Sequence, residues 1–114
     1  MTAPARTPEP PYYAVIFTST RTDVEEGYAA MADLMASLGS QQPGFLGLES
    51  ARGADGLGIT ISYWESEEAI ANWKRHEQHR AAQATGIRTW YSEYVTRVAK
   101  VERAYGFVKR DAQA

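Results

Sequence analysis

Cysteine is absent from the 114-residue sequence, which excludes disulfide bonds, thiolate metal sites and cysteine nucleophiles. An excess of either charge is also absent, because 12 Lys and Arg residues stand against 14 Asp and Glu residues and leave a net charge of −2. This balance disfavours nucleic acid or an anionic membrane as the main partner. No apolar run reaches the roughly 20 residues that span a bilayer, and residues 1–11 lack the apolar core of a signal peptide. The sequence therefore predicts a cytoplasmic protein with no membrane partner.

The motifs of common cofactor sites are missing as well. Neither G-x-G-x-x-G nor G-K-[ST] occurs, so nothing indicates a dinucleotide or a P-loop nucleotide site. The only two histidines, His76 and His79, lie three residues apart and lack the third convergent ligand that a zinc site needs. We therefore expect no bound metal and no cofactor.

The composition that remains is globular and rich in aromatic side chains. Hydrophobic residues make up 44% and charged residues 23%, and seven Tyr, three Trp and three Phe supply large apolar groups. A chain of this length forms one domain. Four of the five prolines lie in residues 1–11, which predicts a disordered N-terminal tail. The folded domain is expected over residues 12–107, followed by a polar C-terminal tail over residues 108–114.

Hydrophobic periodicity predicts four strands and two helical regions. A strand at 12–18 comes first, followed by a helix from a cap at Thr22 or Asp23 to Gly39. Two strands at 45–51 and 57–64 are joined by a turn at 53–56. A helical region from Ser66, its predicted cap, to Trp90 has a break near Gly86 and precedes a strand at 91–105. The order β-α-β-β-α-β is typical of a ferredoxin-like α+β fold, with an antiparallel sheet and both helical regions on one face.

The first strand carries apolar side chains on both faces. One face presents Tyr13, Val15 and Phe17, and the other presents Tyr12, Ala14 and Ile16. A strand of this kind is usually covered on both sides, whereas the helices cover only one face of the sheet. We therefore expect an isologous homodimer that buries the sheets of two copies against each other.

Reactive side chains concentrate in residues 72–79. Asn72, His76 and His79 lie near one face of the expected helix, and Trp73 precedes His76 by three residues. One interpretation is that both histidines are solvated on a charged helix. The other is that one histidine faces a pocket and accepts a proton or donates a hydrogen bond near neutral pH. The sequence leaves both interpretations open.

Large aromatic side chains form a second group, which comprises Tyr63, Trp64, Trp73, Trp90 and Tyr91. Such residues either pack together in a core or wall a flat apolar cavity. Thr60 and Ser62 share a strand face with Trp64, and they would be the polar groups within such a cavity.

The segment from Tyr63 to Tyr91 carries a family pattern. It consists of Tyr63-Trp64-Glu65-Ser66-Glu67-Glu68-Ala69-Ile70, Trp73, His79, Ala82-Gln83 and Trp90-Tyr91. The pattern resembles the antibiotic biosynthesis monooxygenase (ABM) family, and the resemblance covers residues 12–107. The ending at 97–107 resembles an uncharacterised bacterial branch. The resemblance implies the dimeric α+β barrel of that family.

The family includes cofactor-independent oxygenases that act on polycyclic phenols and anthrones. The resemblance therefore implies a monooxygenase that ionises a small aromatic or phenolic substrate between sheet and helices, so that it reacts directly with dioxygen. The candidate catalytic residues are Asn72, Trp73 and His79. The candidate substrate-binding residues are Thr60, Ser62, Tyr63, Trp64, His76 and Trp90.

Two other functions stay open. The first is a non-catalytic dimeric protein that binds a hydrophobic metabolite. The second is haem binding or haem degradation, with His76 or His79 as the ligand. Trp73 matches a helix Trp of the haem-degrading branch, but Gln83 stands where that branch has its iron-ligating His. The Asn that this branch has in its first strand has no counterpart in residues 12–18.

Overall fold

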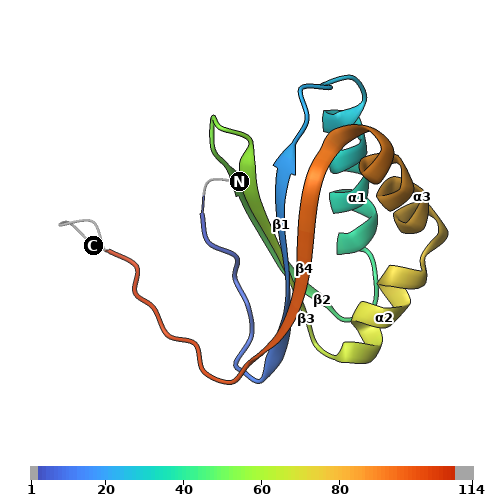
Figure 1. Cartoon of the computed structure of the whole chain (residues 1–114). Coiled ribbons are helices and arrows are strands. Elements are labelled where there is room, and N and C mark those ends of the chain that lie inside the picture. The colour runs from blue at the N-terminus through green and yellow to red at the C-terminus, as the bar shows by residue number, and fades with distance from the viewer. Residues whose placement is uncertain (1–2, 110–114) are drawn as a thin grey trace.

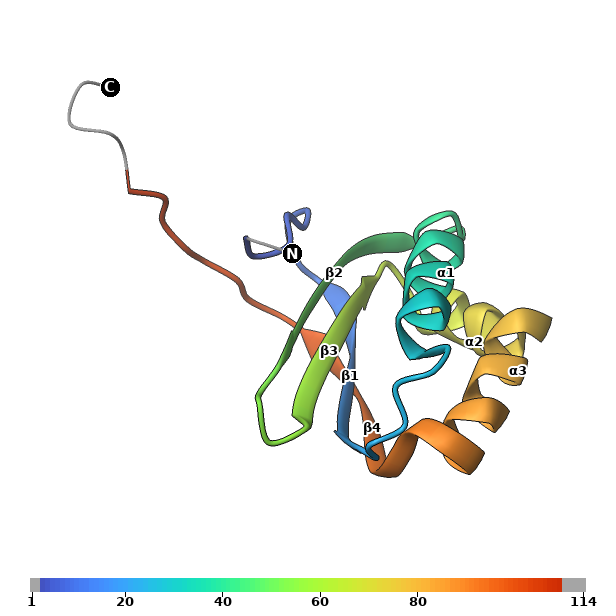
Figure 2. The ribbon, with the colours of Figure 1, turned by 90° about the horizontal axis from the view of Figure 1, so that it is seen from above.

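The computed structural model describes residues 3–109, in which helices pack on one side of a four-stranded sheet (Figure 1). The elements are β1 (Tyr12–Arg21), α1 (Tyr28–Ser40), β2 (Phe45–Arg52), β3 (Leu57–Trp64), α2 (Glu67–Arg75), α3 (Glu77–Thr85), the π-helix η1 (Gly86–Trp90) and β4 (Tyr91–Val101). The strands pair antiparallel in the order β2-β3-β1-β4. Figure 2 shows all three α-helices on the same face. The ferredoxin-like α+β fold predicted from the sequence is confirmed.

The strand register decides which side chains meet the helices. Val15 of β1 lies opposite Ser62 of β3 and Val98 of β4, and Phe17 lies opposite Thr60 and Thr96. Because directly opposed residues project to the same side of a sheet, these side chains share the face that the helices cover.

The other face of the sheet is apolar and only partly covered. Tyr12 and Ala14 of β1 are buried there, at 4% and 5% exposure. Farther along the same face, Leu57 and Ile59 of β3 and Val95 of β4 are 49%, 44% and 45% exposed. Both faces of β1 are therefore apolar, as its sequence predicts.

The start of α1 differs from the expectation. The cap predicted at Thr22 or Asp23 is wrong, since α1 begins at Tyr28, after Gly27 with φ 81°. Thr22 instead makes tertiary hydrogen bonds. Its hydroxyl donates to the carbonyl of Thr89 at 2.7 Å, and its backbone N–H donates to the carbonyl of Trp90 at 2.8 Å. A link across the fold thus replaces the local cap.

The second helical region is divided at His76. Ser66 caps α2 as predicted, since its hydroxyl accepts the N–H of Ala69 at 3.1 Å. His76 then leaves helical geometry, with ψ at 130°, and its Nδ1 accepts the N–H of Gln78 at 3.3 Å. At Gly86 the chain does not stop but widens into the π-helical turn η1.

The terminal segments lie outside the helix–sheet layers. In the segment before β1, the N–H of Ala5 donates to Oε2 of Glu49 at 2.9 Å, and the hydroxyl of Thr7 is 2.9 Å from that of Tyr12. β4 ends at Val101, four residues before the predicted end, and residues 102–109 run away from the sheet (Figures 1 and 2). Residues 1–2 and 110–114 of the expected tails lie outside the described residues, and the boundaries 12–107 stay a prediction. In the described residues no helix is long and apolar enough to cross a membrane.

Candidate functional site

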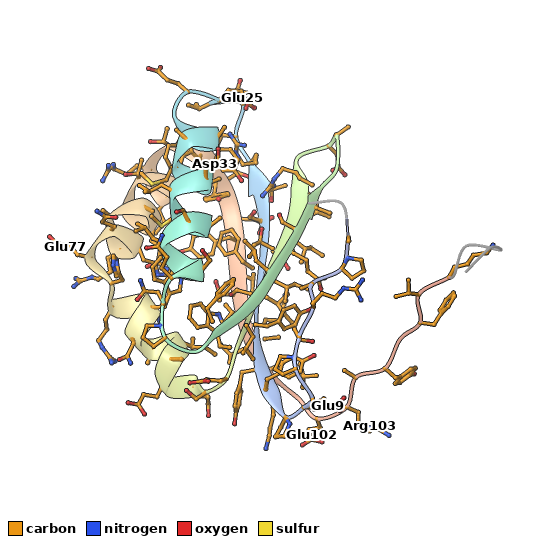
Figure 3. All side chains as sticks on the ribbon, turned by 180° about the vertical axis from the view of Figure 1, so that it is seen from behind. Glu9, Glu25, Asp33, Glu77, Glu102 and Arg103 are labelled. Carbon is orange, nitrogen blue, oxygen red and sulfur yellow. The ribbon has the colours of Figure 1, made fainter. Side chains whose placement is uncertain are left out.

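A cavity of about 610 Å³ lies between the helices and the helix-covered face of the sheet. Its walls come from β1, β2, β3, β4, α1, α2, α3 and η1. Charged side chains such as Glu25 and Glu77 point away from the sheet in Figure 3, whereas side chains crowd the space between α1 and the sheet. A volume of this size falls within the range of about 300–1,000 Å³ that is typical of small-molecule sites.

One end of the cavity is built from stacked rings, which we call the tryptophan stack: His79 on Trp73, and Trp73 on Trp64. The His79 and Trp73 rings are 4.5 Å apart and 8° from parallel. Trp73 and Trp64 follow at 6.5 Å and 25°. Gly39 of α1 lies beside this stack, and a Cβ there would be in ordinary van der Waals contact with the Trp73 ring, at 3.4 Å. The indole thus packs against α1 beside Gly39, which does not end the helix, since α1 continues to Ser40.

The hydrogen bond that His79 makes fixes the tautomer of its imidazole. Nδ1 lies 3.1 Å from the backbone carbonyl of Trp73. Since a carbonyl only accepts, Nδ1 carries the proton and Nε2 keeps a free electron pair. Burial is the main cause that lowers the pKa of His79 below its ordinary value of 6.5, and the charges of His76 and Lys74 act in the same direction. The ring is therefore neutral at pH 7 and able to accept a proton.

Hydroxyl groups line the sheet side of the cavity beside the tryptophan stack. Ser62 accepts Nε1–H of Trp64 at 2.9 Å, which leaves its own hydroxyl proton free to donate. Thr60 is 2.9 Å from the hydroxyl of Ser50. Lys74 of α2 also lines the cavity. Lys74 is exposed, and its charge acts on His79.

Trp90 lies in the wall of the same cavity as a buried side chain, at 6% exposure. Its Nε1–H donates to the carbonyl of Glu26 at 3.0 Å, so its polar tip is already satisfied within the protein. The cavity thus brings together six of the nine candidate residues: Thr60, Ser62, Trp64, Trp73, His79 and Trp90.

The other three candidates do not line the cavity. Tyr63 follows the strand alternation to the opposite face, where its hydroxyl donates to Glu49 at 2.5 Å. The expectation that Tyr63 walls the substrate is corrected by this placement. Asn72 is exposed and accepts a hydrogen bond from Arg75. His76 contacts the Trp73 ring at 5.3 Å from outside the cavity.

Several cavity residues were not among the candidates: Tyr28, Met31 and Met35 of α1, Tyr91 and Tyr94 of β4, and Gln83 of α3. The helical spacing of the α1 residues marks an inward stripe, but the same spacing is also typical of an ordinary core. Tyr94 could have been found from strand alternation, because it shares one face of β4 with Thr96 and Val98, which also line the cavity.

In the part of the chain from 3 to 109, no group of three or more His, Asp and Glu side chains lies together in a way that could hold a metal ion. The polar side chains that line the cavity include Thr60, Ser62, Lys74, His79 and Gln83.

Comparisons with known proteins agree with this architecture. The model of the antibiotic biosynthesis monooxygenase family matches residues 11–85. An uncharacterized Bacillus subtilis protein, YqjZ, is 54% identical over 99 residues, which cover 87% of each chain.

Two solved structures share the fold at low sequence identity. Rv0793 from Mycobacterium tuberculosis superposes with a TM-score of 0.71 at 16% identity, over 82% of this chain and 99% of that one. SnoaB, a cofactor-independent oxygenase from Streptomyces nogalater, gives 0.66 at 14% identity, over 88% and 100%. Because the family model matches most of the chain, and the fold agrees with it, this chain belongs to the antibiotic biosynthesis monooxygenase family.

Proposed function

We propose that this protein is a cofactor-independent monooxygenase that oxidises a planar phenol or anthrone with dioxygen. The observation that carries the proposal is the neutral His79 imidazole, half-buried in an aromatic cavity with Nε2 unprotonated. A general base needs a free electron pair and must be unprotonated at the working pH. SnoaB, whose fold is similar, is a cofactor-independent oxygenase, and this favours the same chemistry here.

The reaction balances without a cofactor because the substrate itself supplies the electrons. Nε2 of His79 removes a proton from an activated CH₂ group, and the resulting carbanion passes electrons to dioxygen. The CH₂ group becomes a carbonyl, a four-electron oxidation in which one oxygen atom enters the product. The other oxygen atom leaves as water, with the proton that His79 returns. The protein contributes orientation, a base and a cavity poor in water.

The surroundings of His79 suit the anion that this step creates. Lys74 supplies a positive charge, and the Ser62 hydroxyl is free to donate. Such groups stabilise charge that develops during the reaction, more strongly in an apolar cavity than in water. The ring of Trp73 provides a flat surface on which a fused aromatic substrate stacks.

Oxygen uptake with anthrone tests the proposal. Wild type is expected to accelerate uptake and release anthraquinone, whereas His79→Ala loses about 10²–10⁴-fold in rate, the usual contribution of a general base. His76→Asn is the matched control, because it removes the other imidazole outside the cavity and keeps a side-chain acceptor for the N–H of Gln78. Uptake by wild type equal to that of buffer alone would refute the proposal.

A non-catalytic binding protein is the second candidate, favoured by the apolar lining of the cavity. It predicts that anthrone quenches tryptophan fluorescence equally in wild type and in His79→Ala, without oxygen uptake. Haem degradation is not favoured, because Gln83 lines the cavity at the position where the haem-degrading branch has its iron-ligating His.

We also infer a homodimer formed through the uncovered sheet face. Leu57, Ile59 and Val95 are each between 44% and 49% exposed on that face, and the extended segment after β4 carries Tyr105 and Phe107 at 100% and 88% exposure. Apolar surface of this kind favours association with a second copy. Ile59→Lys is expected to shift the sedimentation coefficient to that of a monomer. A wild-type monomer at micromolar concentration would contradict the inference.

A further inference from the structure

The cavity has a second aromatic group at the end away from His79, which we call the tyrosine cluster: Phe17, Tyr28, Trp90, Tyr91 and Tyr94. Each ring of the cluster contacts at least one other. Phe17 is 5.3 Å from Tyr91 and 5.0 Å from Tyr94. Tyr28 lies 5.9 Å from Trp90 and 6.0 Å from Tyr91. All five residues line the cavity.

The tyrosine cluster and the tryptophan stack lie well apart. Trp64 pairs with Tyr13, while Phe17 pairs with Thr60, so four residues of strand separate the two positions. At about 3.3 Å per residue this is about 13 Å along the sheet. On the helix side, the seven residues from His79 to Gly86 correspond to about 10 Å. A ligand that reaches both ends therefore has to be longer than a single ring.

Trp90 of the tyrosine cluster is already bonded within the protein, because its Nε1–H donates to the carbonyl of Glu26. Three aromatic tips outside the cluster are also bonded there: Tyr12 to Thr7, Tyr63 to Glu49 and Trp64 to Ser62. The Tyr91 hydroxyl has that of Tyr28 as a hydrogen-bond neighbour. The polar tips of the cluster that a ligand in the cavity would meet are therefore the hydroxyls of Tyr28, Tyr91 and Tyr94, whose side chains line it.

Two guanidinium groups lie near the tyrosine cluster, and Glu25 is 3.9 Å from that of Arg21. The Arg21 guanidinium lies 3.4 Å over the ring of Tyr28, and its Nε–H donates to the carbonyl of Trp90 at 3.1 Å. Arg52 also acts on Tyr91 through its charge. Burial, followed by the neighbouring Tyr28 hydroxyl, nevertheless raises the pKa of Tyr91 above its ordinary value of 10.0, so Tyr91 stays a neutral donor.

Hydrogen bonds join the two chain segments that border the cluster. Figure 1 shows the loop before α1 beside the turn before β4, and hydrogen bonds from Thr22 to Thr89 and Trp90 join them. The π-helix η1 and a register shift in the β1–β4 pairing at Thr20 and Arg21 both border Tyr91. Irregularities of these two kinds recur beside functional sites, where they re-aim a side chain.

We propose that the tyrosine cluster is a second recognition site, in which Tyr91 and Tyr94 donate hydrogen bonds to an oxygen atom on the substrate ring farthest from His79. The acceptor is a carbonyl or a phenol oxygen, which positive charge and neutral donors both favour. The proposal rests on the proposed function only in taking His79 as the reacting end. It assigns the cavity a fused-ring substrate with oxygen atoms at both ends.

Two naphthols of the same shape test the proposal, with binding measured by tryptophan fluorescence without oxygen. Wild type is expected to bind 2,6-dihydroxynaphthalene about 3- to 10-fold more tightly than 2-naphthol, the gain from one net hydrogen bond. The double variant Tyr91→Phe/Tyr94→Phe should reduce this preference to less than 2-fold while it retains the affinity for 2-naphthol. Tyr63→Phe removes a hydroxyl on the opposite sheet face and should keep the full preference.

A preference that survives in the double variant overturns the proposal, as does a wild type that binds neither naphthol at millimolar concentration. Each single variant keeps its ring, so it is measured separately should the double variant unfold, and each is expected to lose part of the preference. The binding assay excludes oxygen and is therefore independent of turnover. If the double variant loses the preference and wild type shows no oxygen uptake with anthrone, the monooxygenase proposal is refuted and the second recognition site is supported.

Discussion

Replacing Trp73 by Ala tests whether the tryptophan stack both stabilises the fold and tunes His79. The indole is half-buried, stacks on His79 at 4.5 Å and packs against Gly39. Truncating a fully buried aromatic residue to Ala costs about 3–5 kcal/mol. With half of this burial, and a ring contact that adds about 0.5–1.5 kcal/mol, we expect the free energy of unfolding to fall by about 2–4 kcal/mol.

Urea unfolding measures that loss, and NMR titration of His79 supplies a second readout. Burial is the largest cause of the lowered pKa of His79, so removal of the indole should raise that pKa toward 6.5. Trp73→Phe is the matched control, because it keeps a ring and should show a smaller effect in both measurements. A loss below about 1 kcal/mol with an unchanged His79 pKa would refute the reasoning.

Three further predictions follow from single contacts. Gly39→Ala places a methyl group in ordinary contact with Trp73, at 3.4 Å, and should raise the free energy of unfolding by about 0.5–1 kcal/mol through reduced chain entropy. A destabilisation in urea unfolding would contradict this. Because the pKa of folded His79 lies below 6.5, unfolded chains bind the proton first as the pH falls. The free energy of unfolding should therefore fall as the pH drops from 6.5 to the pKa of His79 in the folded protein. In His79→Gln, the urea midpoints should not show this part of the fall. Burial and then Glu49 raise the pKa of Tyr63 to about 12, so Glu49→Gln should lower it toward 10.0 without reaching that value in an ultraviolet titration. An unchanged titration would show that Glu49 does not act on the phenol.

Strand alternation is the part of the site that the sequence predicts best. Thr60, Ser62 and Trp64 share a face because side chains alternate along any strand, and the structure has them together in the cavity wall. The same rule excludes Tyr63, which is adjacent to Trp64 and must project to the other side. Grouping Tyr63 with the tryptophans followed aromatic character alone and ignored this alternation.

Tertiary contacts explain what local patterns miss at the start of α1. Thr22 has the side chain and the spacing of a helix cap, but its hydroxyl and its N–H bond to Thr89 and Trp90, more than 60 residues away in sequence. Gly27, with its positive φ, begins α1 instead. No local signal distinguishes these outcomes, since the partners of Thr22 come from the turn before β4. The same turn supplies Trp90 to the tyrosine cluster and places it beside Tyr28 of α1, a contact that no local pattern predicts.

The difference between His76 and His79 depends on one backbone feature. On a continuous helix, residues three apart lie on the same side, and both imidazoles would face the same surroundings. The chain breaks at His76 because its Nδ1 accepts the N–H of Gln78 and so starts a new helix, without any glycine or proline to mark the place. The new helix carries His79 back under Trp73, where its Nδ1–H reaches the Trp73 carbonyl. His76 therefore caps the new helix, whereas His79, neutral and half-buried, is the base of the proposed reaction.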